Sequence, residues 1–196
     1  MTIDEHFPQL TGFFSIKTTY DGLRSFNTCI SYLNENYPDL IKNCVVVSPD
    51  AGGGSRAESF IEKAGIENIA IGHKVRKNGK IVKHQLLGDV DGKYAHIVDD
   101  IIDSGQSIVD VAKICKERGA SKVYAYATHG LFTKGTDLEA IDHIFTTDTV
   151  YRGSAPNVEV ISLAKLVADA IYGINEGESL SPLFKLPREY ISDPNE

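Results

Sequence analysis

The chain has 196 residues and a formal net charge of −7, with 27 acidic and 20 basic side chains. A chain of this length can bury enough apolar surface for an ordinary core, and we predict a single domain over residues 1–196. The acidic balance argues against a nucleic-acid partner, and no apolar run approaches the ~20 residues of a membrane span. The three cysteines, Cys29, Cys44 and Cys115, lack metal-ligand spacing and indicate core thiols in a reducing cytoplasm.

The first third of the chain predicts one helix and one strand. Residues 20–37 are predicted to be helical, and Asn36 and Pro38 end the helix. Its apolar face consists of Leu23, Phe26, Cys29 or Ile30, and Leu33. Residues 44–47 then form a short apolar run, which is typical of a buried strand.

A glycine-rich loop follows this strand in residues 48–56. Gly52, Gly53 and Gly54 let the backbone approach a diphosphate closely, and Asp50 can hold the Mg²⁺ of that diphosphate. Residues 57–64 have helical apolar spacing, so the loop connects a strand to a helix. Such turns are also common packing devices, and the loop alone leaves both interpretations open.

A basic hairpin is predicted after a third strand at residues 68–72. Asn78-Gly79 between alternating side chains is a strong hairpin signal. Such charges on a hairpin often serve only to discourage pairing at a sheet edge. We favour a mobile lid that brings positive charge to a phosphoryl group in transfer. The cations on its two arms are Lys74, Arg76, Lys77, Lys80 and Lys83.

The chain is organised around residues 94–107, where an apolar strand meets two carboxylates and a short loop. The helix after the loop has its apolar face on Ile108, Val111, Ala112 and Cys115. Its first N–H groups favour an anion, and the carboxylates suit the cis hydroxyls of a sugar, directly or through Mg²⁺. The alternative is that the loop residues are only turn and N-cap residues beside solvated carboxylates. The predicted sugar-phosphate site consists of Asp99, Asp100, Asp103, Ser104, Gly105, Gln106 and Ser107.

The second half of the chain alternates strands and helices. Gly119 is a predicted helix end, residues 123–127, 144–147 and 158–161 are predicted strands, and residues 137–144 are predicted to be helical. The last helix has its apolar face on Leu163, Leu166, Val167, Ala170 and Ile171. This alternation predicts an α/β fold with a mainly parallel sheet, helices on both faces and ligand loops at the carboxyl ends of the strands.

Several of these segments together resemble one known family. Residues 97–107 are similar to the phosphoribosyl-diphosphate motif of the type I phosphoribosyltransferase fold. Among families with that fold, the chain looks most like the ribose-phosphate diphosphokinases, also called phosphoribosyl diphosphate synthetases. The other segments that carry the resemblance, in the family's order and approximate spacing, are residues 45–53, 74–76, 88–93, 119–130 and 147–149.

The resemblance implies an activity and roles for individual residues. The implied reaction is Mg²⁺-dependent transfer of diphosphate from ATP to ribose 5-phosphate, with the carboxylate pair on the ribose hydroxyls and the loop around the 5-phosphate. The implied metal ligands are His6 and Asp50. The implied nucleotide or diphosphate residues are Gly52, Gly53 and His6, and the implied catalytic cations are Lys74 and Arg76. His129 lies in an Ala-Thr-His segment of the family, where a structural role is the safer interpretation.

The resemblance covers the later part of the family's longer chain. Residues 1–20 are similar to its interdomain segment, and its preceding domain has no counterpart here, so we expect a fragment or a naturally short homologue. Two alternatives stay open: a phosphoribosyltransferase that consumes phosphoribosyl diphosphate, and a non-catalytic subunit of a full-length synthetase. The expected partners are therefore ribose 5-phosphate with ATP or phosphoribosyl diphosphate, and either a second copy of the chain or a longer synthetase.

Overall fold

The main sheet of the computed structural model has seven strands in the order β5-β4-β3-β6-β7-β8-β9. The structure describes residues 1–77, 80–151 and 153–185, without the side chains of Pro8 and residues 74–84. Neighbouring strands are parallel except β4 and β5, so the prediction of a mainly parallel sheet is confirmed. The strands are β3 (Cys44–Ser48), β4 (Ile69–Lys77), β5 (Lys80–Leu87), β6 (Tyr94–Ile102), β7 (Lys122–Gly130), β8 (His143–Thr147) and β9 (Val158–Ile161).

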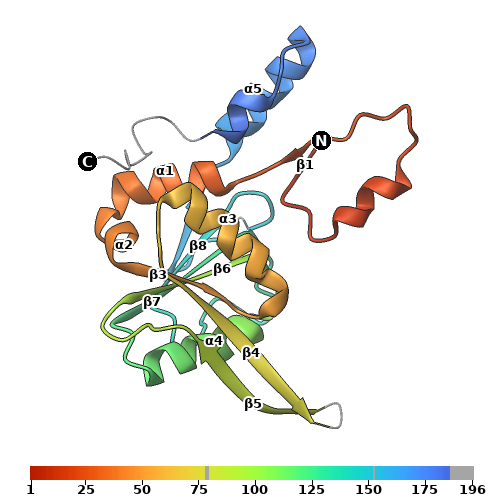
Figure 1. The fold of residues 1–196 in the computed structure, drawn as a ribbon. Helices are drawn as coiled ribbons and strands as arrows, with labels where there is room; N and C mark the ends of the chain where they lie inside the picture. The colour runs from red at the N-terminus through yellow and green to blue at the C-terminus, as the bar shows by residue number, and fades with distance from the viewer. Residues whose placement is uncertain (78–79, 152, 186–196) are drawn as a thin grey trace.

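Helices cover both faces of this sheet, as predicted (Figure 1). α1 (Phe26–Asn36), α2 (Pro38–Asn43) and α3 (Gly54–Ala64) pack on one face, and α4 (Gln106–Glu117) packs on the other. α5 (Ala164–Glu176) is the blue helix that extends away from the sheet in Figure 1. Short 3-10 helices are η1 (Pro8–Phe13), η2 (Ala51–Gly53) and η3 (Ser181–Phe184). No helix within the described ranges is long and apolar enough to cross a membrane.

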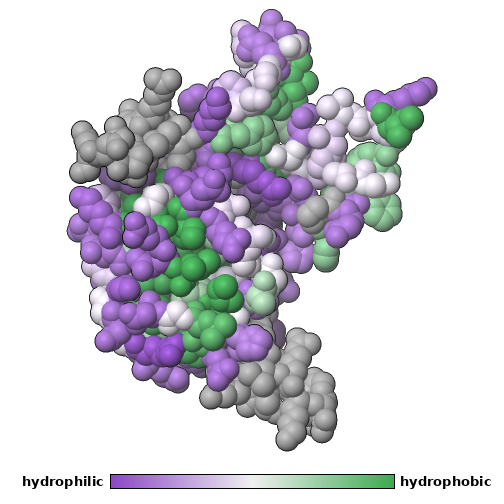
Figure 2. Space-filling view, in the orientation of Figure 1, coloured by the Kyte–Doolittle hydropathy of each residue, from purple (hydrophilic) through white to green (hydrophobic). Residues whose placement is uncertain are grey.

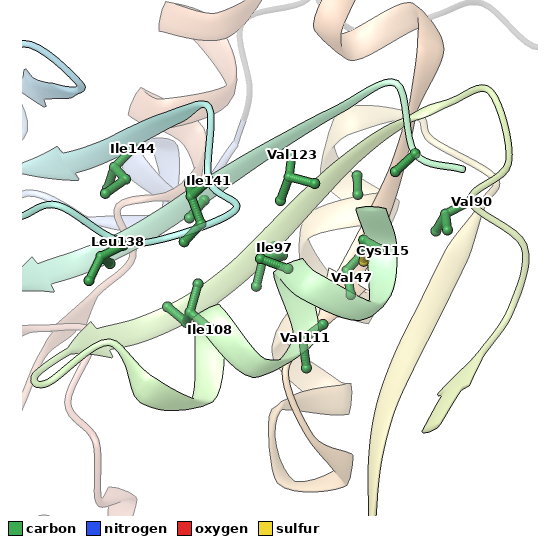
Figure 3. Close-up of a cluster of buried hydrophobic side chains, with 14 of the residues drawn as sticks. Val47, Val90, Ile97, Ile108, Val111, Cys115, Val123, Leu138, Ile141 and Ile144 are labelled. Atoms are coloured by element: carbon green, nitrogen blue, oxygen red, sulfur yellow. The ribbon is translucent and has the colours of Figure 1, made fainter. Parts of the chain in front are cut away.

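The predicted apolar face of α4 is confirmed, since Ile108, Val111, Ala112 and Cys115 are all buried. Figure 3 shows this face against side chains of β3, β6 and β7, among them Val47, Ile97 and Val123. Burial of such side chains contributes on the order of 1.5–3 kcal/mol each relative to exposure. The packing therefore holds the first turn of α4 against the end of β6, and it positions the loop between them.

The opposite face of the sheet has a more aromatic core. Phe26 of α1 and Phe60 of α3 pack edge to face, with ring centroids 5.3 Å apart, above Tyr126 and Phe145. His96 of β6 lies among them with an exposed fraction of 0%, and its ring centroid is 5.3 Å from that of Phe60. Both ring nitrogens of His96 are buried without a hydrogen-bond partner among the described residues.

The N-terminal residues form a small parallel sheet of their own. β1 (Thr2–Ile3) pairs with β2 (Gly22–Leu23), and Leu23 packs with Leu163, Leu166 and Ala170 around the start of α5. Between these strands lies a projecting segment that we call the N-terminal arm, residues 7–19 (Figure 1). Figure 2 shows hydrophobic residues on this arm and on α5. The exposed apolar side chains there are Phe7, Leu10, Phe13, Phe14, Ile16, Ile171, Tyr172 and Ile174.

Two predicted helices are wrong in position or in kind. The helix expected over residues 20–37 begins only at Phe26, because Gly22 and Leu23 pair with β1 instead. Residues 137–144 form no helix: Ala140 has φ +66°, and the chain enters β8 at His143. Leu138 is nevertheless buried near α4. Its apolar character therefore reflects core packing rather than helical periodicity.

Candidate substrate site

Two cavities lie at the carboxyl end of β6, one lined by Asp99 and the other by Asp100. The strand continues through Asp99 and Asp100 to Ile102, so both carboxylates belong to the strand itself. Successive strand residues point to opposite faces, and the structure follows this rule. Asp99 lines a cavity of about 250 Å³ formed by residues 101–108, whereas Asp100 lines a cavity of about 280 Å³ on the α3 side. The aspartates are thus neighbours in sequence but line different cavities.

The first cavity is built around the N-terminus of α4. It brings together Asp99 and all five predicted loop residues, Asp103, Ser104, Gly105, Gln106 and Ser107. The N-cap residue is Gly105, which has no side chain to cap the helix, and the Ser104 hydroxyl lies 3.5 Å from the Gln106 amide nitrogen. Gly105 has φ +75°, and a Cβ there would lie 2.6 Å from Leu138 Cδ2. The loop therefore depends on glycine at this position, and it presents backbone N–H groups at the positive end of the helix.

Asp103 is tied to the next loop rather than to the helix it precedes. Its Oδ1 accepts from Thr133 Oγ1 at 2.7 Å, and its carbonyl oxygen accepts from Thr133 N at 3.0 Å. These two bonds connect the loop before α4 to the loop after β7. Asp103 is therefore not the N-cap of α4, which was one alternative from the sequence, because the N-cap is Gly105.

Arg56 joins the two aspartates, which sequence reasoning missed. Its Nη1 donates to Asp99 Oδ1 at 2.8 Å, and its Nη2 donates to Asp100 Oδ2 at 2.7 Å. His6 Nδ1 lies 2.7 Å from the same Asp100 oxygen, so the structure places His6 beside the aspartate pair. The partners are 43, 44 and 94 residues apart in sequence. The one sequence signal for Arg56 was its position in the first turn after the glycine loop.

The surroundings of the two carboxylates shift their pKa values in opposite directions. Burial raises the pKa of Asp99 to about 6, and the negative charge of Asp100 adds to the rise, while Arg56 opposes it. Burial also acts to raise the pKa of Asp100, but the hydrogen bond with His6 and the charge of Arg56 outweigh it and leave that pKa below its usual value. Asp100 is therefore the firmly ionised member of the pair.

The glycine loop turns its amides toward Asp50. Asp50 Oδ1 accepts from Gly52 N at 2.9 Å and from Gly53 N at 3.1 Å. The expected diphosphate donors are thus bonded to the expected metal ligand. Among the described residues, those lining the two cavities do not include Asp50, Gly52 or Gly53, so the loop lies beside the cavities. No group of three metal-ligating side chains is found in the described part of the chain.

A buried polar network anchors the N-terminal segment at the site. Asp4 Oδ2 accepts from Ser25 N at 3.0 Å and from Thr128 Oγ1 at 2.9 Å. His129 contacts Thr149 Oγ1 at 2.9 Å through Nδ1, and the Ile3 carbonyl oxygen at 3.1 Å through Nε2. Both of its ring nitrogens serve structure, which agrees with the structural role predicted for it. The network fixes the segment that carries His6.

The basic hairpin is present as an antiparallel pair of strands. β4 and β5 pair from Ile71 with Leu87 to Lys77 with Lys80, with a register irregularity between Val75 and Arg76. The Asn78-Gly79 turn lies outside the described residues. So do the side chains of the predicted lid cations Lys74, Arg76, Lys77, Lys80 and Lys83.

Comparison with known proteins gives consistent matches. Residues 74–185 match the family model of the phosphoribosyl synthetase-associated domain. Ribose-phosphate pyrophosphokinase 5 of Schizosaccharomyces pombe is 36% identical over 190 residues, which cover 94% of this chain and 54% of the relative. Ribose-phosphate pyrophosphokinase of Aquifex aeolicus is also 36% identical, over 94% of this chain and 60% of the relative.

A solved structure agrees with these sequence matches. The phosphoribosylpyrophosphate synthetase of Mycobacterium smegmatis superposes with a TM-score of 0.77 at 31% identity. The match covers 89% of this chain and 58% of that protein. The chain therefore spans little more than half the length of the relatives that it matches.

Proposed function

The chain belongs to the phosphoribosyl synthetase-associated domain family, and from this premise we propose that it transfers diphosphate from ATP to ribose 5-phosphate. The anomeric hydroxyl of the sugar attacks the β-phosphorus of ATP and loses its proton. The bond from the β-phosphorus to the α-phosphate oxygen breaks, so the products are phosphoribosyl diphosphate and AMP. The printed names of the matched relatives, ribose-phosphate pyrophosphokinases, support this reaction.

The observation that carries the proposal is the α4 N-terminus beside Asp99 in one cavity. A helix N-terminus with glycine as its N-cap offers backbone donors and a positive dipole end to a phosphate. Asp99, across the same cavity, is an acceptor for sugar hydroxyls. A ribose 5-phosphate has both groups, so one ligand satisfies the two halves of the cavity.

We assign the nucleotide diphosphate to the second cavity, on the α3 side. Arg24, Arg56 and Lys63 line it and are the candidate cations for the diphosphate. The same cavity is also lined by the carboxylates Asp4, Glu5 and Asp100. Asp99 and Asp100 are adjacent and both bond Arg56, so the two cavities are neighbours at the end of β6. Substrates bound in both would have their reacting atoms close together, and such positioning supplies much of the rate in phosphoryl transfer.

Mg²⁺ fits this arrangement through carboxylates. The ion prefers oxygen ligands and is commonly held by one or two carboxylates together with substrate phosphates and water, so a three-residue cluster is not required. Asp50 uses Oδ1 for the glycine amides, which leaves Oδ2 for the ion. His6 already bonds Asp100 and is better suited to orient that carboxylate or a phosphate than to bind a hard cation directly. When bound, Mg²⁺ neutralises charge on the diphosphate oxygens.

Lys74 and Arg76 remain our candidates for the catalytic cations. Both lie on β4, one strand from the glycine loop, in the hairpin that leaves the sheet edge. A hairpin that closes over the cavities would add positive charge where the transferred diphosphate gains negative charge. Replacing Lys74 with alanine is then expected to slow turnover far more than it weakens ribose 5-phosphate binding.

The exposed N-terminal arm supports an assembly in which another chain covers it. Phe13 is 88% exposed and Ile16 is fully exposed, although both are large apolar side chains. Apolar surface of this kind marks interaction sites in soluble proteins. We propose either a homo-oligomer or an association with a longer synthetase, in which the partner also adds to the ATP site.

The test is an assay of AMP and phosphoribosyl diphosphate by ion-exchange chromatography, with purified chain, Mg²⁺, ATP and ribose 5-phosphate. We expect both products in equal amounts, no AMP without the sugar, and loss of both in Asp99→Asn. The matched control is Asp169→Asn, since Asp169 pairs with Lys165 on the surface of α5. AMP release that does not depend on ribose 5-phosphate, or no products at all, would refute the proposed reaction for this chain.

A further inference from the structure

Arg56 lines the α3-side cavity and bonds one aspartate of each cavity. Its guanidinium donates to one oxygen of Asp99 and to one oxygen of Asp100, at 2.8 and 2.7 Å. The side chain of Arg56 is 26% exposed, and those of Asp99 and Asp100 are 21% and 4% exposed. A planar fork of donors can hold two carboxylates at once, which a lysine ammonium on a flexible stem does less well.

The aspartates need such a partner because they carry like charges side by side. Asp100 is nearly fully buried, and a buried carboxylate is strongly destabilised unless it is paired and hydrogen-bonded. Arg56 supplies one positive charge to both residues while it bonds a single oxygen of each. Each carboxylate therefore keeps its second oxygen for another donor, in an orientation that the guanidinium defines.

Arg56 also connects the aspartates to the glycine loop. It belongs to the first turn of α3, which begins at Gly54 directly after that loop. A Cβ on Gly53 would lie 3.7 Å from Arg56 Nη1 and 2.8 Å from Ser48 Oγ. The loop thus passes close to the guanidinium. A shift of the glycine loop relative to β6 would therefore move the Arg56 guanidinium and change its hydrogen bonds to both carboxylates.

We propose that Arg56 is a positioning residue that orients Asp99 toward ribose 5-phosphate and holds the glycine loop in register with the end of β6. This inference rests on the proposed function, because it gives Arg56 its role through the sugar-phosphate site. Toward the sugar, Arg56 acts through the aspartates, because its guanidinium bonds Asp99 and Asp100 and lines the α3-side cavity rather than the cavity at the α4 loop. Its loss is expected to reduce ribose 5-phosphate affinity even though the α4 loop is unchanged.

The experiment measures ribose 5-phosphate binding to the full chain by isothermal titration calorimetry. Arg56→Ala is expected to bind at least about tenfold more weakly than the wild type, because Asp99 then lacks the charge-assisted bond that orients it toward the sugar. Arg56→Lys is expected to lie between them, because an ammonium can replace one bond of the fork. The matched control is Lys113→Ala, which removes a cation of α4 that pairs with Glu139 and is expected to bind as the wild type does.

Chemical rescue separates positioning from mere stabilisation of the fold. Ethylguanidinium at millimolar concentration should restore binding to Arg56→Ala and leave Arg56→Lys unchanged, because only the alanine variant has room for it. Thermal unfolding of each variant shows that the fold is retained. Affinity that is equal in wild type and Arg56→Ala, or a loss that follows stability and is not rescued, would overturn the role of Arg56. A wild-type chain that does not bind ribose 5-phosphate would instead refute the proposed function, and the role of Arg56 with it.

Discussion

Replacing His96 with leucine is expected to stabilise the protein. His96 lies on the central strand β6 with an exposed fraction of 0%, and the rings of Phe60 and Phe145 flank it. Neither ring nitrogen has a hydrogen-bond partner in the described structure. Leucine has a similar volume and no polar side-chain atoms, so it can fill the same apolar surroundings without leaving a buried polar atom unpaired.

The expected gain at neutral pH is about 2 kcal/mol. A buried polar group without a partner costs about 1–3 kcal/mol, and the imidazole has two nitrogens. Repacking around a side chain of different shape usually costs less than about 1.5 kcal/mol, which offsets part of the gain. The substitution should therefore raise the midpoint of urea unfolding without changing the slope of the transition.

The pH dependence gives a sharper signature. Burial lowers the pKa of His96 from 6.5 to about 3 in the folded chain. Below pH 6.5 the unfolded chain binds a proton that the folded chain does not, so stability is full above pH 6.5 and falls as the pH approaches 3. The loss is about 1.4 kcal/mol per pH unit, or about 2–3 kcal/mol between pH 6.5 and 4.5.

The assay is urea unfolding followed by circular dichroism at pH 7.5, 5.5 and 4.5. His96→Leu should exceed the wild type by a margin that widens as the pH falls, because only the wild type loses the His96 contribution. His73→Gln is the control, since His73 is an exposed histidine on β4. A His96→Leu protein that is less stable than wild type, or a margin that does not grow on acidification, would refute this reasoning.

Three further results are expected. Gly105→Ala should lower the free energy of unfolding in urea by about 1–2 kcal/mol and weaken ribose 5-phosphate binding, because φ is +75° and the new Cβ would meet Leu138. Unchanged affinity would argue against the α4 loop as the phosphate site. Glu159→Gln should lower the free energy of unfolding by about 1–3 kcal/mol at pH 7, because Glu159 accepts hydrogen bonds from Tyr32 and Tyr37. Glu178→Gln, on the exposed tail, is the control and should leave the stability unchanged. Ile16→Ser should lower the sedimentation coefficient if the N-terminal arm is an interface, and an unchanged coefficient would leave the arm without that role.

The sequence predicted the parts of the fold that depend on local periodicity. α4 and its buried face were predicted because Ile108, Val111, Ala112 and Cys115 repeat at helical spacing, and they are buried for the same reason. Residues 137–144 were predicted wrongly because a loop that packs Leu138 and Ile141 under α4 has the same spacing. Periodicity reports burial, and it cannot by itself separate a buried loop from a helix.

The grouping of residues at the α4 N-terminus could be predicted because these residues are close together in sequence. Asp99 lies on β6 and residues 103–107 form the loop that follows this strand, and the structure places them in one cavity. The α3 half could not be predicted, since Arg56 meets Asp100 only through the packing of α3 on β6. Asp50 is a different case, because its bonds to the Gly52 and Gly53 amides are local and make it the N-cap of η2, a role that was not predicted from the sequence. Contacts that the tertiary fold creates leave little local signal in the sequence.

The most direct test of the central claim compares ribose 5-phosphate with ribose in calorimetric titrations of the wild-type chain. Several charge-assisted hydrogen bonds at the α4 N-terminus should make the phosphorylated sugar bind at least about a hundredfold more tightly. Asp99→Asn should remove binding of ribose 5-phosphate while its melting temperature shows a folded protein. Equal affinity for the two sugars, or full affinity in Asp99→Asn, would contradict a sugar-phosphate site at the end of β6.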